Sequence, residues 1–198
     1  CHVRSKGAGD GLDSAVGLGS RGIGEERLAS KDAFLVPRNS LPFFNRGRPE
    51  FSVLFWDGRV QLGPKGEFQT PLGEKLPEGF DSLLAAASVF PLAEPDEMLG
   101  RSEERGRNPS RYHQELLSDT GVADNNFQER TLVVFRNLPK RLLGERESSA
   151  ITAQAQYRQL FSQAYPGVPL AKLSISHVGN GLAAYIDAAF NLKPAPWD

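Results

Sequence analysis

The fold is most constrained by the stretch Val53-Leu54-Phe55-Trp56-Asp57-Gly58-Arg59-Val60. A tryptophan stands there between an apolar run and an Asp-Gly pair, and such pairs are typical of tight turns. Taken alone, the stretch predicts the end of a strand or helix that buries Trp56 in the core and turns at Gly58. Asp57 and Arg59 are expected to fix this turn by pairing locally, without a part in chemistry.

Length and charge limit the classes of protein to consider. At 198 residues the chain suits one domain with a sizeable core, since one domain commonly takes about 150 residues. The 23 Lys and Arg against 24 Asp and Glu give a net charge of −1, which argues against nucleic acid or an anionic membrane as the partner. No run approaches the roughly 18 apolar residues of a membrane span, and no signal peptide is visible.

The chain offers few soft metal ligands. Its one cysteine, Cys1, excludes an internal disulfide and a cysteine-rich metal site. Three roles stay open for Cys1: a free thiol, an intermolecular link, or half of a haem attachment. With three histidines and one methionine, a self-contained transition-metal cluster is not expected.

Residues 1–50 are expected to be looped. Glycine stands at positions 7, 9, 11, 17, 19, 22, 24 and 47, and proline at 37, 42 and 49. This density disfavours long helices and central strands. A loop of such length inside a compact domain is commonly functional or disordered, and wrapping a large planar cofactor is one function that fits.

After residue 80 the spacing of apolar residues predicts helices. We expect them over 80–90, 126–143, 152–165 and 174–190. Asp81 or Ser82 should cap the first helix and Pro91 should stop it. Pro139 should kink or split the second. Because neither an internal repeat nor an alternation of strands with helices is evident, the fold class we predict is mainly α, with a polar insertion at about 101–126.

A glycine-rich motif raises a different class of function. Gly17-Leu18-Gly19-Ser20-Arg21-Gly22 matches the Gly-x-Gly-x-x-Gly pattern of dinucleotide-binding enzymes. That pattern needs a hydrophobic strand before it and a helix after it. Here the segment Asp10-Gly11-Leu12-Asp13-Ser14, which is not a hydrophobic strand, precedes the motif. Gly22-Ile23-Gly24, which disfavours a helix, follows it. The sequence therefore argues against nucleotide binding.

Several segments in a fixed order resemble one known family. Besides the tryptophan stretch, they are Cys1-His2, Val36-Pro37-Arg38-Asn39-Ser40, Phe90-Pro91 and Asp96-Glu97-Met98-Leu99-Gly100. Together they resemble the first, peroxidatic haem domain of the bacterial dihaem cytochrome c peroxidase and MauG family. The resemblance runs over nearly the whole chain apart from the insertion. It implies a cytochrome c-like helical haem domain with long Gly/Pro-rich loops.

Both ends of the chain resemble interior points of that family's sequence. In the haem-attachment motif Cys-x-x-Cys-His, two thiols bond the haem and the histidine ligates its iron, and the chain begins at the last two residues of this motif. Residues 191–198 resemble the segment where the first domain leads into the second. We therefore expect 1–198 to be a partial N-terminal haem domain, truncated at both ends, with the second haem domain missing.

The resemblance assigns roles to individual residues. Cys1 and His2 would hold haem c, with His2 as the ligand of the haem iron. Trp56 matches a tryptophan between the two haems, whose aromatic ring can help electrons pass. Asn39 matches a side-chain ligand of a calcium ion between the domains, although an asparagine that only forms a turn fits the same residues.

Glu97 matches the family's distal acid/base residue, because it stands six residues after Pro91. A carboxyl group is wanted there because bound peroxide must lose a proton from its near oxygen and gain one on its far oxygen before the O–O bond breaks heterolytically. Glu94 and Asp96 are the near rivals for this role. Only Glu97 has its proline and methionine neighbours in the family's order.

The sequence departs from the family in two places. Some members carry a histidine about sixteen residues after the proximal one, which blocks the peroxidatic iron, whereas residues 14–24 contain no histidine here. The distal face is therefore expected to be open. A glutamine often stands four residues before the distal proline, but here that residue is Ala87, so one hydrogen-bond partner of peroxide is absent.

The expected function is a haem-dependent peroxidase that reduces hydrogen peroxide with electrons from a small c-type cytochrome or another donor. The resemblance implies a periplasmic protein with two covalent haem c groups at full length, calcium as a further ligand, and a fragment that is inactive alone. Two other classes stay open: an electron-transfer or sensory haem domain that has lost turnover, and a cofactor-free helical interaction domain.

Overall fold

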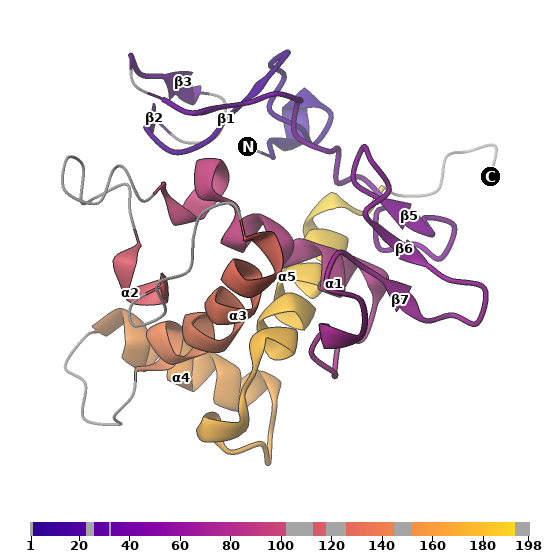
Figure 1. The fold of residues 1–198 in the computed structure, drawn as a ribbon, viewed down its shortest axis with the longest axis vertical. Helices are drawn as coiled ribbons and strands as arrows, with labels where there is room; N and C mark the ends of the chain where they lie inside the picture. The colour runs from indigo at the N-terminus through magenta and orange to yellow at the C-terminus, as the bar shows by residue number, and fades with distance from the viewer. Residues whose placement is uncertain are drawn as a thin grey trace.

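A computed structural model describes residues 2–22, 26–31, 33–101, 113–117, 126–144 and 152–192. Figure 1 shows three parts: a helical body, an N-terminal segment that lies along the top of this body, and a small sheet beside it. None of the described helices is long and apolar enough to cross a membrane.

The described residues contain five α-helices, which form the helical body, and several single turns along the chain. The helices are α1 (Leu83–Ser88), α2 (Gln114–Leu117), α3 (Phe127–Leu143), α4 (Thr152–Ala164) and α5 (Ile175–Phe190). The short turns are η1 (Arg4–Lys6), η3 (Gly73–Lys75), η4 (Phe90–Ala93), η5 (Pro95–Leu99) and η8 (Leu170–Lys172). All of these are 3₁₀ turns except η5, which is a π-helical turn.

Polar side chains fix where the main helices begin. The Ser82 hydroxyl accepts a hydrogen bond from the backbone N–H of Ala85 at 3.1 Å, which satisfies a free donor at the start of α1. Asn126 accepts from the N–H of Glu129 at 3.2 Å at the start of α3. At α5 the N–H of Ser174 bonds His177 Nδ1 at 3.1 Å. Local signals in the sequence thus decide these boundaries.

The core forms where α1 packs against α5 and where η4, which follows α1, packs against α3. Leu83 to Ala87 of α1 are all buried, and Phe90 directly after it is 1 % exposed. The backbones approach closely, since a Cβ on Gly179 of α5 would lie 2.6 Å from the carbonyl oxygen of Ala85. Phe90 also packs edge-on against Phe135 of α3, with ring centroids 5.7 Å apart. These helices form the support for the segments around residues 90–100.

The described part of the first seventy residues contains seven short strands. They are β1 (Ala15–Val16), β2 (Ser20–Arg21), β3 (Leu28–Ala29), β4 (Leu35–Val36), β5 (Val53–Leu54), β6 (Val60–Leu62) and β7 (Phe68–Gln69). All pairings are antiparallel, and the sheets are β1-β4, β2-β3 and β5-β6-β7. The tryptophan stretch therefore forms a hairpin, in which β5 and β6 flank the turn.

The prediction of a mainly α, cytochrome c-like fold is wrong in this respect. Of the described residues 46 % are helical, and 11 % lie in strands of small sheets. The glycine and proline density did exclude long strands, but segments of two or three residues between turns can still pair. The region expected to be loop is therefore a set of small hairpins and bridges.

Two further expectations concern Pro139 in α3 and the polar insertion expected at about 101–126. Helix α3 is one continuous helix with Pro139 inside it, not two helices. Most of the expected insertion, 102–112 and 118–125, lies outside the described residues. Between those ranges Leu116 and Leu117 of α2 are buried, and α2 packs against α3. This portion belongs to the core.

Candidate functional site

The β5–β6 turn presents Trp56 at the surface. Trp56 is 56 % exposed, and its indole N–H donates to the backbone carbonyl of Asn39 at 3.1 Å. The prediction of a core tryptophan, made from the stretch alone, is therefore wrong. The turn does close at Gly58, which has φ +67°, and Phe55 also has a left-handed backbone with φ +65°. Trp56 and Asn39, two predicted site residues, thus lie in contact.

His2 is held in one orientation by its neighbours. Its Nδ1 lies 3.2 Å from the carbonyl oxygen of Ala8, and its ring stacks on Phe43 with centroids 3.4 Å apart. Burial is the largest cause that lowers the pKa of His2 to about 4, so the ring is neutral at pH 7. Because a carbonyl only accepts, Nδ1 carries the proton and Nε2 keeps a lone pair. Cys1 lies outside the described residues.

Glu97 lies on the turn η5 and is the other titratable group with a strongly shifted pKa. Glu97 is exposed to solvent as a residue, yet protein atoms surround much of its carboxyl group. This desolvation is the first cause that raises the pKa of Glu97 to about 7. The negative charges of Glu94 and Asp96 raise it further, and the guanidinium of Arg59 lowers it.

The two rival carboxylates are paired, unlike Glu97. Asp96 makes a two-pronged ion pair with Arg101, at 2.6 and 2.7 Å. Glu94 lies between Arg59 and Arg130, at 3.5 and 3.6 Å. No cation of the described residues forms a salt bridge with Glu97. A carboxyl group that is poised near neutral pH and unpaired is the chemistry expected of a proton shuttle.

The N-terminal segment meets the Glu97 turn directly. The backbone N–H of Leu18 donates to the carbonyl of Asp96 at 2.9 Å, and a Cβ on Gly17 would lie 1.9 Å from that same oxygen. Gly17 is thus required for close approach to η5. Because Ser20–Arg21 forms β2 where a dinucleotide motif needs a helix, the structure also argues against a nucleotide site.

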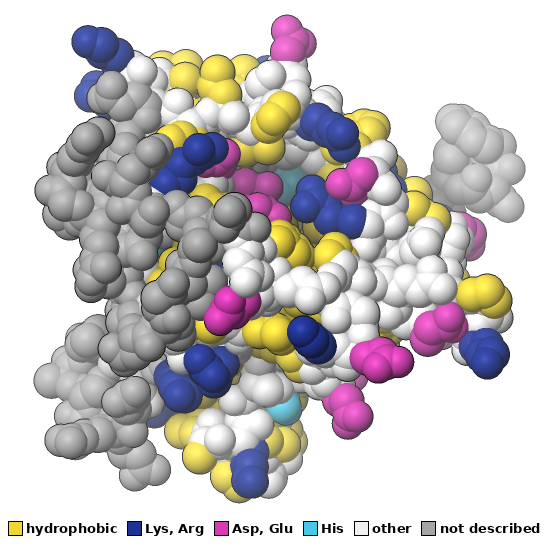
Figure 2. All heavy atoms as spheres, viewed as in Figure 1, with side chains coloured by type: hydrophobic (Ala, Val, Ile, Leu, Met, Phe, Trp, Pro, Cys, Tyr) yellow, Lys and Arg dark blue, Asp and Glu magenta, His cyan; other side chains and the backbone are white. Residues whose placement is uncertain are grey.

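A second contact attaches the same segment to the end of α5. The ring of Phe43 packs edge-on against Phe190 with centroids 5.5 Å apart, and the N–H of Asn45 donates to the carbonyl of Phe190 at 3.2 Å. Arg4 also donates to the carbonyl of Ala189. Figure 2 shows a hollow below the N-terminal segment, with acidic side chains and a histidine at its floor.

The ligands present fit a haem better than a free metal ion. Within the part of the chain that the structure describes, no three His, Cys, Asp or Glu side chains come together as a metal site. A haem brings four nitrogen ligands of its own and needs only an axial side chain from this domain. His2 meets that need, since it is neutral and its Nδ1–H bonds a carbonyl, the usual arrangement of a ligating histidine.

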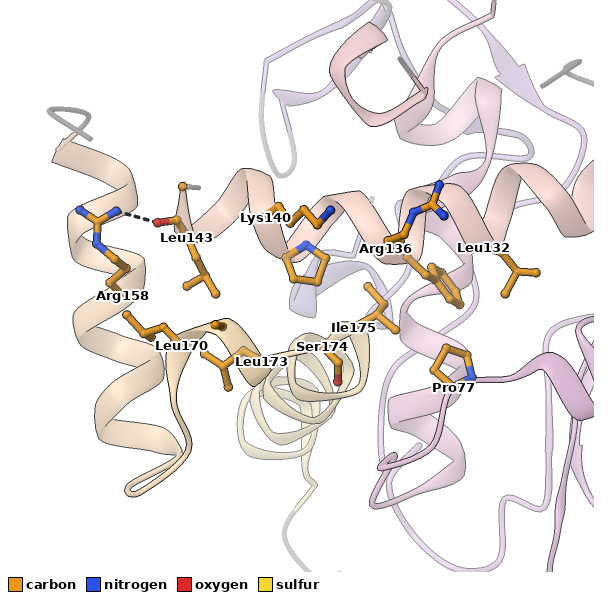
Figure 3. Close-up of a pocket in the computed structure, with 14 residues that line it drawn as sticks. Pro77, Leu132, Arg136, Lys140, Leu143, Arg158, Leu170, Leu173, Ser174 and Ile175 are labelled. Carbon is orange, nitrogen blue, oxygen red and sulfur yellow. Dashed lines mark hydrogen bonds between the residues drawn. The ribbon is translucent and has the colours of Figure 1, made fainter. Parts of the chain in front are cut away.

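A cleft elsewhere on the molecule contains none of the predicted site residues. It measures about 640 Å³ and lies among α3, α4, η8 and the start of α5 (Figure 3). Its walls are mostly apolar side chains such as Leu132, Leu143 and Leu173, with Arg136 and Lys140 of α3 beside them. The predicted site residues therefore lie away from this cleft.

Sequence reasoning missed the two cations that pair with Glu94. Arg59 was expected only to fix the turn, and Arg130 was not considered. A signal for Arg130 does exist, because it stands on the same face of a predicted helix as Phe127 and Val134, and a charge on an apolar face calls for a buried partner.

The comparisons with known proteins bear on the whole chain. A family model described as di-haem cytochrome c peroxidase matches residues 1–198. No curated protein and no solved structure matches the chain.

Proposed function

The chain belongs to the di-haem cytochrome c peroxidase family, and from that premise we propose that it forms the domain in which hydrogen peroxide is reduced. The overall reaction takes one peroxide, two protons and two electrons to two molecules of water. The family gives the haem-dependent peroxidase chemistry. The residues that carry it in this chain, and the donor of the electrons, are our proposals.

The observation that carries the proposal is the state of Glu97. It is the unpaired carboxyl group among three neighbouring acidic residues, and its pKa of about 7 lets it hold or release a proton at neutral pH. We infer that its carboxylate takes the proton from the near oxygen of peroxide and returns it to the far oxygen. One group can do both because the two steps follow each other.

His2 is the side chain of this domain that would hold the haem iron. When bound, haem supplies the iron to which peroxide binds and the electrons that break the O–O bond. His2 would ligate that iron through Nε2, while the hydrogen bond from Nδ1 to Ala8 holds the imidazole in this tautomer. Cys1 would provide one thioether link. Because two covalently attached haems need four thiols and the chain has one cysteine, the other attachment thiols would come from residues outside this sequence.

Trp56 and Asn39 lie on the exposed face that electrons would cross. The indole ring stands at the surface, fixed by its bond to the Asn39 carbonyl. We propose that Trp56 passes electrons from a second haem, which a small c-type cytochrome or a similar periplasmic donor reduces. Asn39 would lend its side-chain oxygen to calcium, with the remaining ligands from other residues and water.

One observation supports a second function, in which the domain carries electrons or senses a ligand without peroxide turnover. Ala87 is 5 % exposed within α1, so the residue that replaces the family's usual glutamine packs in the core and offers no hydrogen bond to peroxide. In that case haem would bind but peroxide would not be consumed.

The test uses full-length protein, exported through a c-type haem maturation system. We expect a haem stain that persists on a denaturing gel, a Soret band, and peroxide consumption with a reduced c-type cytochrome. Haem that leaves on acid-acetone extraction would contradict covalent attachment at Cys1. A haem spectrum without peroxide consumption would select the second function, and absence of a Soret band would leave a cofactor-free domain.

A further inference from the structure

Glu94 is held between two guanidinium groups from different parts of the chain. Its Oε1 lies 3.5 Å from Nη1 of Arg59, and its Oε2 lies 3.6 Å from Nη2 of Arg130. The side chain of Arg130 is only 5 % exposed, and its Nε donates to the carbonyl of Ala93 at 3.0 Å. Because arginine stays charged when buried, Arg130 depends on Glu94 as its counter-ion. We call these three side chains the Glu94 bridge.

The Glu94 bridge joins three elements at the point where the turn η5 begins. Arg59 follows the β5–β6 turn, Arg130 comes from α3, and Glu94 is the residue before η5. The carbonyl of Glu94 also accepts hydrogen bonds from the N–H groups of Met98 and Leu99, at 3.1 and 3.0 Å. Glu94 thus fixes the turn through its backbone and anchors it through its side chain.

The charges around Glu97 come from its own turn and from the elements packed against it. Glu94 and Asp96 stand on or beside the turn, and Asp96 is paired with Arg101. From the β5–β6 turn comes Arg59, which also pairs with Asp57. The N-terminal segment contributes the backbone of Leu18, which carries no charge. Glu94 and Arg59 are therefore opposite charges whose effects on Glu97 oppose each other.

We propose that Glu94 is a positioning residue: held by Arg59 and Arg130, it fixes the turn that carries Glu97 and, together with Arg59, sets the pH at which the Glu97 carboxyl exchanges its proton. The proposal rests on the proposed role of Glu97 as the distal acid and base. It also gives Arg59 a second role, because the same guanidinium stabilises the Trp56 turn through Asp57. A substitution at Glu94 should therefore change the pH at which Glu97 exchanges its proton, without changing the amount of haem bound.

The experiment removes the charge of Glu94 or of Arg59, the two partners of one ion pair, in full-length, haem-loaded protein. Infrared titration follows the carboxyl stretch that Glu97→Gln removes, so it reports Glu97 without any turnover. Glu94→Gln should move the midpoint of this titration to lower pH by about half a pH unit, and Arg59→Gln should move it to higher pH by about as much. The pH profile of peroxide turnover should shift in the same two directions.

Matched variants separate this proposal from a general loss of structure. Arg59→Lys keeps the charge and should restore the wild-type midpoint, whereas the exposed-surface variants Glu74→Gln and Arg48→Gln should leave it unchanged. If Glu94→Gln does not fold, the comparison of Arg59→Gln with Arg59→Lys decides the question. Midpoints that stay fixed, or that move in the same direction in Glu94→Gln and Arg59→Gln, overturn the proposal. If instead Glu97→Gln turns over peroxide normally, the proposed function fails, while the infrared midpoints still test the bridge independently.

Discussion

The pKa of about 7 at Glu97 predicts how peroxide reduction depends on pH. The first proton transfer needs the carboxylate form, so its rate constant should follow the ionised fraction. With a pKa of about 7 this fraction is about 0.9 at pH 8, about 0.1 at pH 6 and about 0.01 at pH 5. We therefore expect the second-order rate constant to fall about tenfold per pH unit below pH 7. A glutamate at its ordinary pKa would stay mostly ionised down to about pH 5.

Stopped-flow mixing of full-length protein with peroxide measures this rate constant across pH. Glu97→Gln keeps the size of the side chain but cannot exchange the proton, so it should lower the plateau roughly 10²–10⁴-fold and remove the inflection near pH 7. Asp96→Asn is the control for the plateau rate, because Asp96 pairs with Arg101, and loss of its charge should only move the inflection to lower pH. A flat wild-type profile, or a Glu97→Gln rate equal to wild type, would refute the assignment of the distal residue.

Four other outcomes follow from the same contacts. Trp56→Phe should leave the first reaction with peroxide nearly intact and slow the delivery of electrons, as stopped-flow phases would resolve; equal slowing of both phases would point to a purely structural tryptophan. The resting ferric spectrum should show a high-spin component without prior reduction, because the other two histidines are engaged elsewhere, His113 with Arg141 and His177 at the start of α5; a purely low-spin spectrum would contradict this. Since the folded pKa of Glu97 is raised, wild-type stability should decline as pH rises from 4.5 through about 7, so Glu97→Gln should increase the melting temperature at pH 8 and leave it unchanged at pH 4. Phe90→Ala should cost about 3–5 kcal/mol in urea unfolding, because Phe90 is 1 % exposed in the core.

The helical part of the fold could be predicted because its signals are local. Ser82 and Ser174 stand at helix starts in the sequence and in the structure, and the apolar stripe before Phe190 is the buried face of α5. The small sheets could not be predicted in this way. Ala15 of β1 pairs with Val36 of β4, and a two-residue strand has no periodicity that could indicate such a partner.

In the candidate site, too, the features with local signals could be predicted, and those that depend on residues distant in the chain could not. Spacing within one segment selects Glu97 over its neighbours, and the structure shows those neighbours paired, while the role of Glu97 stays a prediction. The buried partner of Glu94, Arg130, lies 36 residues further along the chain than Glu94 and reaches it through the packing of α3. The exposure of Trp56 was also hidden, because an apolar run before a tryptophan predicts burial unless the direction of the turn is known.

The direction of that turn depends on Phe55. A left-handed backbone at an aromatic residue costs on the order of 1–3 kcal/mol and persists only where the surroundings impose it. Here the guanidinium of Arg59 lies over the Phe55 ring at 4.8 Å from its centroid, and the indole N–H of Trp56 donates to the Asn39 carbonyl. Arg59 is the same cation that pairs with Glu94, so the strain that turns Trp56 outward and the charge that tunes Glu97 depend on one side chain. On the proposed roles of Trp56 and Glu97, electron entry and proton exchange would both depend on Arg59, and loss of its charge should disturb both.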